Sequence, residues 1–379
     1  MASYPAGKRR PSTPETSSGA FWMVATMLLG LTVAIVGIFA LLMWSDARDS
    51  RGTTDSAAEP AAALTDHNTA LPLDSFAGIV PENAAELAAA HKPYDAKLPP
   101  VPAGDLVKVQ MTLKDMTVDI APGVKYNTWA FDGHGAPGPI VHVREGQTVE
   151  MKLTNGGSIP HSIDFHAARI APNVAFKDVM PGESIVYRFK ATDPGVYMYH
   201  CGTKPVLAHI ANGMYGAIIV QPKVALPKVD NEYVLVGSEW YLNGDGIKEP
   251  ASLSMAKARA RMADWVTFNG YANQYVTHPL TANPGETTRF WVVAAGPTNN
   301  VNFHIVGTIF DRAWVNSDLK SPPQVGVQTV VVPAGGGAVF DVKIDDEGFY
   351  PVVSHAFADV DLGQVGLLKV GNPKKAASH

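Results

Sequence analysis

The chain has 379 residues, enough for about two domains, and 46% of them are hydrophobic. Only 17% are charged and the formal net charge is −5, so the sequence does not have the basic character of a nucleic-acid-binding protein. The 34 Gly and 29 Pro residues favour turn-rich β structure over long helices. A single cysteine excludes an intrachain disulfide and a CxxC zinc site, but beside 12 histidines it allows a mixed sulfur–imidazole metal site.

The first predicted element is a membrane-spanning helix over residues 20–44. This stretch carries no charge, and at about 1.5 Å per residue it exceeds the roughly 30 Å hydrocarbon core of a bilayer. Lys8, Arg9 and Arg10 precede it, which predicts that residues 1–19 are cytoplasmic and that the rest lies outside the cytoplasm, in a periplasm or on the outer face of the cell membrane. A cleaved signal peptide is the alternative, although its apolar region typically has only about 7–15 residues.

Residues 45–100 are predicted to form a linker, because they are rich in Ala, Asp, Thr and Pro and poor in large apolar side chains. Within the linker, residues 81–96 can hold one short helix with Pro81 in its first turn. In the second half of the chain, residues 252–265 form the one plausible helix.

From Leu106 onward, short runs with period-two alternation between Gly/Pro turns predict two sets of β-strands. A proline-rich boundary separates a first domain, residues 101–224, from a second, residues 229–371, and residues 372–379 form a tail. The segment PGESIVYRFKATDPGVYMYHC resembles PAGGGAVFDVKIDDEGFYPVVSHAF about 150 residues later, which indicates an internal repeat. The sequence therefore predicts an all-β protein with two tandem Greek-key β-sandwich domains.

The strongest motif surrounds the single cysteine. Cys201 is followed by His209 and Met214 with the spacing Cys-x7-His-x4-Met. A further histidine, His161, lies forty residues upstream. Two imidazoles, a thiolate and a weak thioether are the ligands of a blue-copper electron-transfer site, because soft sulfur stabilises Cu(I) and imidazole accommodates Cu(II). A buried core cysteine beside unrelated His and Met is the alternative, and the spacing disfavours it.

A second metal site is predicted from neighbouring residues. His200 precedes Cys201, and adjacent residues of a strand point to opposite faces. If Cys201 and His161 face one metal, His200 and His166 therefore face another. His355 holds the matching position in the second repeat, where the other blue-copper ligands are missing. Two histidines completed by a third from the second domain would form an all-nitrogen copper centre with an open position.

The segments HSIDFH, GVYMYHC, HIANGMYGAIIVQP and YPVVSHAF make residues 101–370 resemble the copper-containing nitrite reductases, which are trimers of two-cupredoxin subunits. The resemblance implies two cupredoxin-like domains, and it implies that Asp164 hydrogen-bonds nitrite and relays protons. The implied type 1 copper ligands are His161, Cys201, His209 and Met214. The implied type 2 copper ligands are His166 and His200 from one subunit and His355 from its neighbour.

One segment departs from the family pattern. When residues 303–311 are aligned on Gly307 and Asp311, His304 matches the first of two family histidines. Ile309 then occupies the position of the second, which is expected to be the catalytic one. Because the reaction takes up two protons per electron, this loss is expected to affect catalysis. His304 is interpreted either as a substitute acid or as a packed structural histidine.

The implied reaction is nitrite, one electron and two protons giving nitric oxide and water. An exported cupredoxin or cytochrome c would donate the electron to the type 1 copper. The electron would then pass through Cys201 and His200 to the type 2 copper. Two alternatives stay open. A laccase-type multicopper oxidase needs about eight histidines, commonly in His-x-His pairs, and the chain has no such pair. The other is an electron-transfer or copper-holding cupredoxin with an inactive second site.

Overall fold

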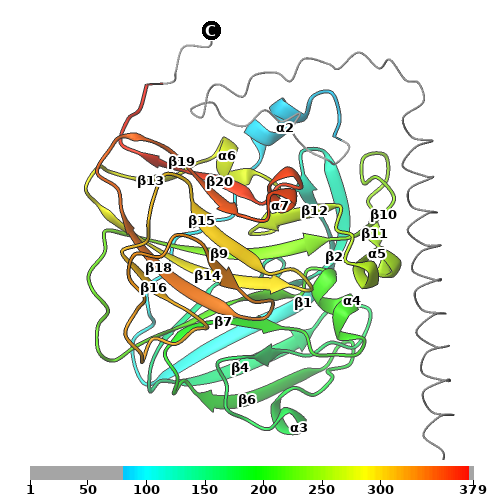
Figure 1. Ribbon diagram of the computed structural model, residues 1–379. Coiled ribbons are helices and arrows are strands. Elements are labelled where there is room, and N and C mark those ends of the chain that lie inside the picture. The colour runs from blue at the N-terminus through cyan, green and yellow to red at the C-terminus, as the bar shows by residue number, and fades with distance from the viewer. Residues whose placement is uncertain (1–79, 375–379) are drawn as a thin grey trace, which may run out of the picture. The chain divides into compact units, whose positions relative to one another are not determined.

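The computed structural model describes residues 80–374, and the predicted cytoplasmic segment, the membrane-spanning helix and most of the linker lie outside the described residues. Among residues 80–374, no helix has the length and apolar character needed to cross a bilayer. The described part is mostly β-sheet (Figure 1), which confirms the all-β prediction.

Two sheets are built from residues 106–221. Their strand orders are β2-β1-β4-β6 and β3-β8-β7-β5. The strands are β1 (Leu106–Ala121), β2 (Val124–Phe131), β3 (Val141–Arg144), β4 (Thr148–Asn155), β5 (Asp164–Phe165), β6 (Ser184–Lys190), β7 (Gly195–His200) and β8 (Tyr215–Gln221). The alternating side chains of both sheets meet in one core, where Leu113 and Met151 of the first sheet pack with Tyr199 and Ile218 of the second.

Two five-stranded sheets follow in residues 231–370, with strand orders β12-β9-β14-β18-β16 and β13-β20-β19-β15-β17. Their strands are β9 (Asn231–Trp240), β12 (Trp265–Phe268), β13 (Leu280–Ala282), β14 (Thr287–Gly296), β15 (Val301–Ile305), β16 (Arg312–Trp314), β17 (Val330–Val332), β18 (Gly337–Lys343), β19 (Gly348–Ser354) and β20 (Val365–Val370). A small hairpin joins β10 (Leu242–Asn243) to β11 (Ser252–Leu253). Phe290 and Phe340 of one five-stranded sheet pack with Phe303 and Leu368 of the other.

A third core joins the two pairs of sheets. Met198 and Ile219, from β7 and β8, pack with Val234, Trp291 and Val339, from β9, β14 and β18. The sheet that contains β7 is therefore covered on both faces by other sheets, and the four sheets form successive layers (Figure 1). Because β7 is held on both sides, the residues at its end are fixed in position.

The helices within residues 80–374 are short. The helix α2 (Ala84–Ala90) confirms the prediction within residues 81–96. The helix α5 (Met255–Ala260) is shorter than predicted, because Ser254 caps its start and Arg261 adopts a left-handed conformation at its end. Four further one- or two-turn helices were not predicted: α3 (Pro172–Ala175), α4 (Val206–Ala211), α6 (Gln274–Thr277) and α7 (Phe357–Asp361).

Candidate metal centres

Three predicted ligands meet at one end of the first pair of sheets. Cys201 directly follows β7, His209 lies on α4, and His161 lies in the loop before β5. Nδ1 of His161 is 3.1 Å from Nδ1 of His209. Sγ of Cys201 lies 3.2 Å from Nδ1 of His209 and 3.9 Å from Nδ1 of His161. We call these three residues, all of them buried, the buried cluster.

The buried cluster fits a metal ion. Two nitrogen ligands held about 2.0 Å from a metal at a tetrahedral angle lie about 3.3 Å apart, close to the separation seen here. Met214 is buried in the same core. Its backbone carbonyl accepts from the Cys201 N–H at 3.1 Å, and its N–H donates to the His209 carbonyl at 3.1 Å. These two bonds hold Met214 beside Cys201 and His209.

The imidazoles of the buried cluster are neutral at pH 7. Burial first, and then the neighbouring His209, lower the pKa of His161 to about 4, against the opposing effect of Asp115 and Asp178. Burial also lowers the pKa of His209, and the charge of Asp178 opposes this shift. A neutral ring nitrogen is the form that binds metal, so burial prepares both rings for this role.

The second group of predicted residues lies on the other side of the same strand. Asp164, His166 and His200 place their ligand atoms within 4.8 Å of one another, and we call them the outer cluster. Nε2 of His166 is 3.0 Å from Nε2 of His200, and Nε2 of His200 is 3.9 Å from Oδ2 of Asp164. The adjacent residues His200 and Cys201 thus belong to different clusters, as strand geometry predicts.

Backbone carbonyls orient both rings of the outer cluster. Nδ1 of His200 lies 2.9 Å from the Cys201 carbonyl, and Nδ1 of His166 lies 3.1 Å from the Gly335 carbonyl. A ring nitrogen makes such a bond only as the donor, so in the neutral rings each Nε2 carries a lone pair directed at the other. A cation between them removes their repulsion. Sequence reasoning missed both carbonyls, because a main-chain acceptor leaves no mark on residue type.

His355 is not part of the outer cluster within one chain. It is exposed, directly follows β19, and donates its N–H to the Asn302 carbonyl at 2.6 Å. Its ring lies 4.8 Å from that of Phe357 and 5.3 Å from that of His304. The described chain therefore presents the outer cluster and His355 at separate places.

The structure places His304, and not Ile309, beside His355. In the register of β15 and β19, His304 pairs with Val353. His355 comes two residues after Val353, so its side chain points to the same face as those of Val353 and His304. Nδ1 of His304 is 2.7 Å from the Gln328 carbonyl. Ile309 lies on the next loop and is 64% exposed. This geometry differs from the expectation that Ile309 marks the catalytic position, because the strand register depends on pairing that local alignment does not reveal.

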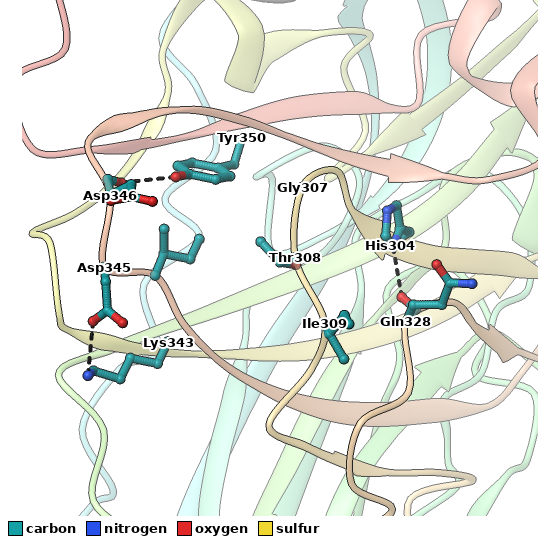
Figure 2. A pocket seen from close by; sticks show the side chains of 10 residues that line it. His304, Gly307, Thr308, Ile309, Gln328, Lys343, Asp345, Asp346 and Tyr350 are labelled. Carbon is teal, nitrogen blue, oxygen red and sulfur yellow. Dashed lines mark hydrogen bonds and ion pairs between the residues drawn. The ribbon is translucent and has the colours of Figure 1, made fainter.

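His304 and Ile309 both line a hollow of about 670 Å³ at the edge of the second pair of sheets. Figure 2 shows His304 turned toward Gln328 on one side of the hollow, with Lys343 and Tyr350 across from it. The hollow is open, so a small solute can reach His304.

Comparisons with known proteins define the class first. A multicopper oxidase family model matches residues 112–225. A solved multicopper oxidase structure aligns with a TM-score of 0.62 and 26% identity, over 70% of this chain and 89% of that one. The chain is thus a copper protein of the cupredoxin type.

Similarity to individual proteins identifies the family. Copper-containing nitrite reductase of Neisseria meningitidis serogroup B is 40% identical over 270 residues, which cover 70% of this chain and 68% of the relative. The enzyme of Pseudomonas chlororaphis is 29% identical over 289 residues, 70% of this chain and 78% of the relative. The copper nitrite reductase structure from Nitrosomonas europaea aligns with a TM-score of 0.64 and 37% identity, over 72% of this chain and 98% of that one. The chain belongs to the copper-containing nitrite reductase family.

Proposed function

We propose that this protein reduces nitrite to nitric oxide at the outer cluster, with an electron that enters at the buried cluster. The observation that carries the proposal is the pair of neighbouring residues Cys201 and His200, which link two metal-binding clusters through one peptide unit. Copper supplies one-electron chemistry at both places, and mixed sulfur–imidazole and all-imidazole ligand sets both suit it. One type 1 and one type 2 copper per subunit follow from the two clusters.

Asp164 is the proposed group that binds nitrite by a hydrogen bond and delivers a proton. Its carboxylate lies 3.9 Å from Nε2 of His200, so a ligand bound beside that nitrogen is within its reach. The reaction uses one electron and two protons and releases nitric oxide and water. We assign the delivery of the second proton to His304: its Nδ1 donates to the Gln328 carbonyl, so its Nε2 has a lone pair that can take up a proton from solvent and pass it on.

A homotrimer would bring His355 and His304 of one subunit to the outer cluster of the next. The outer cluster has two imidazoles and His355 is exposed, so each is incomplete alone. Exposed apolar side chains lie at the hollow and beside His355, as expected for a surface that is covered in an assembly. Ile309 lines the hollow, and the ring of Phe357 lies 4.8 Å from that of His355.

The alternatives have less support. A laccase-type oxidase needs a trinuclear copper cluster, whereas residues 80–374 hold only the buried and outer clusters as metal-ligand groups. A pure electron carrier would not need the outer cluster, with its two rings fixed by carbonyl bonds. Copper content separates the three: about two per subunit for the reductase, four for the oxidase and one for the carrier.

We also propose that residues 20–44 anchor the enzyme, with both clusters outside the cytoplasm and a small exported cupredoxin or cytochrome c as electron donor. The support is the uncharged stretch and the three basic residues before it. Native protein that fractionates with membranes and keeps its N-terminal segment agrees with this anchor. A mature N-terminus just after residue 45 would contradict it.

The decisive experiment measures nitric oxide formed from nitrite by copper-loaded full-length protein in detergent, with an artificial electron donor. One nitric oxide per electron is expected. Asp164→Asn is the matched variant, because it keeps the shape of the side chain but lacks the acid; it should keep both coppers and lower turnover about 10²–10⁴-fold. A protein with both coppers bound and no nitric oxide formation would refute the proposal.

A further inference from the structure

The Gly335 carbonyl that accepts from Nδ1 of His166 belongs to a tight turn, residues 333–336, between β17 and β18. The Gly336 N–H donates to the Pro333 carbonyl at 2.7 Å, which is the bond that closes a β-turn. The turn belongs to the second pair of sheets and His166 to the first. The orientation of this ring therefore depends on how the second pair of sheets holds the turn.

A side chain from a neighbouring loop bonds to the same turn. Asn300 lies between β14 and β15, and its Oδ1 accepts from the Ala334 N–H at 3.0 Å. The loop is itself held by Glu239, a buried carboxylate of β9, which accepts from the Thr298 N–H at 3.1 Å and from the Asn299 N–H. Asn300 is exposed, but these two bonds fix the backbone immediately before it.

These contacts form one continuous chain of hydrogen bonds from the His166 ring to Asn300. The ring N–H donates to the carbonyl of the Gly335–Gly336 peptide group, because a carbonyl only accepts. The N–H of that peptide group donates to the carbonyl of the Pro333–Ala334 peptide group, whose own N–H donates to Oδ1 of Asn300. All three donors point the same way along the chain, so each bond polarises the next peptide group and makes its carbonyl oxygen a stronger acceptor.

We propose that Asn300 is a positioning residue of the type 2 copper site, which strengthens His166 as a copper ligand through these two peptide groups. The inference rests on the proposed function, because it requires copper at the outer cluster. A strong acceptor at Nδ1 of a metal-binding histidine fixes the ring and raises the basicity of Nε2, the nitrogen that faces His200 in the outer cluster. A stronger acceptor at the Ala334 N–H therefore makes His166 a stronger ligand.

The test compares how tightly the two clusters hold copper when residue 300 is replaced in the full-length protein. Electron paramagnetic resonance separates type 1 from type 2 copper, so titration with a competing chelator gives both affinities in one sample. Asn300→Ala should lower the type 2 affinity about tenfold, the lower end of the effect of removing a partner of a ligand histidine, and should leave the type 1 affinity unchanged. Asn300→Asp keeps an oxygen acceptor and adds a negative charge, so its type 2 affinity should be at least that of wild type.

A matched control is Asn127→Ala. Asn127 is also exposed, and its Oδ1 also accepts one hydrogen bond, from Thr117, so this change should alter neither affinity. An unchanged type 2 affinity in Asn300→Ala, an equal loss at both coppers, or a loss as large in Asn300→Asp would overturn the inference. A wild-type protein without any type 2 signal would instead refute the assignment of copper to the outer cluster.

Discussion

At the scale of single residues, the adjacent residues His200 and Cys201 lie in different environments. Cys201 is fully buried with one N–H donor on its sulfur, whereas His200 turns to the outer cluster and bonds through Nδ1 to the Cys201 carbonyl. This carbonyl joins the two clusters by a hydrogen bond as well as by the chain. Each cluster still has its own ligand atoms, so we expect each to bind copper without the other.

Replacement of the cysteine tests this independence. Cys201→Ala should remove the intense visible band of the oxidised protein, because the band needs a copper–thiolate bond. The variant should keep about one copper per subunit, since the outer cluster binds through imidazole. Absorption spectra and metal analysis measure the two effects. His166→Ala is the matched control and should do the reverse, keeping the colour and losing the other copper. A band that survives in Cys201→Ala would show that the ligand assignment is wrong.

Substitutions of His304 and Ile309 should have different effects on nitrite turnover. His304→Ala should lower nitrite turnover about 10²–10⁴-fold, the usual contribution of a positioned acid–base group, and should leave the copper content unchanged. Ile309→His should leave turnover near that of wild type, because Ile309 is 64% exposed on a loop while the ring beside His355 is that of His304. Steady-state assays and metal analysis check both. If Ile309→His raised turnover and His304→Ala did not lower it, position 309, as in the sequence alignment, and not His304 would be the catalytic position.

At the scale of strands and helices, the sequence predicts the structural features that depend on the local pattern of apolar and polar residues. Period-two alternation predicts the strands, and the step from His200 to Cys201 predicts two clusters on opposite sides of β7. The position of His304 beside His355 follows from the register of β15 and β19, which no local pattern reveals. The carbonyl of Gly335 reaches His166 from 169 residues away, and residue type carries no trace of it.

Pairing of β14 with β18 also buries charge, which gives a prediction of stability. Arg289 lies opposite Asp341 in the register and donates to it from Nε at 2.6 Å and Nη2 at 2.8 Å, with both side chains buried. Asp341→Ala leaves the guanidinium without its carboxylate and should lower the free energy of unfolding by about 3–5 kcal/mol. Arg188→Ala breaks the exposed pair with Glu150 and should cost about 0–1 kcal/mol. Denaturant titrations compare the two, and equal costs would contradict the argument from burial.

At the scale of the whole molecule, the outer cluster and His355 lie apart in one chain, whereas the proposed site requires them to meet. Rotational symmetry solves this, because each subunit of a ring can give His355 to one neighbour and receive it from the other. The exposed side chains of Ile309, at the hollow, and Phe357, beside His355, would then be buried between subunits. This arrangement makes the number of complete sites equal to the number of subunit contacts.

Complementation between inactive variants tests the shared site directly. His355→Ala keeps the outer cluster but cannot complete its neighbour's, and His166→Ala has the opposite defect, so each alone should lack turnover. Co-expressed in equal amounts, they should form mixed trimers in which about a quarter of the contacts join an intact outer cluster to an intact His355. Nitrite turnover should therefore return to about a quarter of the wild-type value. Co-expression of His166→Ala with His200→Ala is the control, and it should stay inactive because both changes lie on the same side of the contact. No recovery in the first mixture, or a copper-loaded monomer that is fully active, would show that His355 does not complete a neighbour's site.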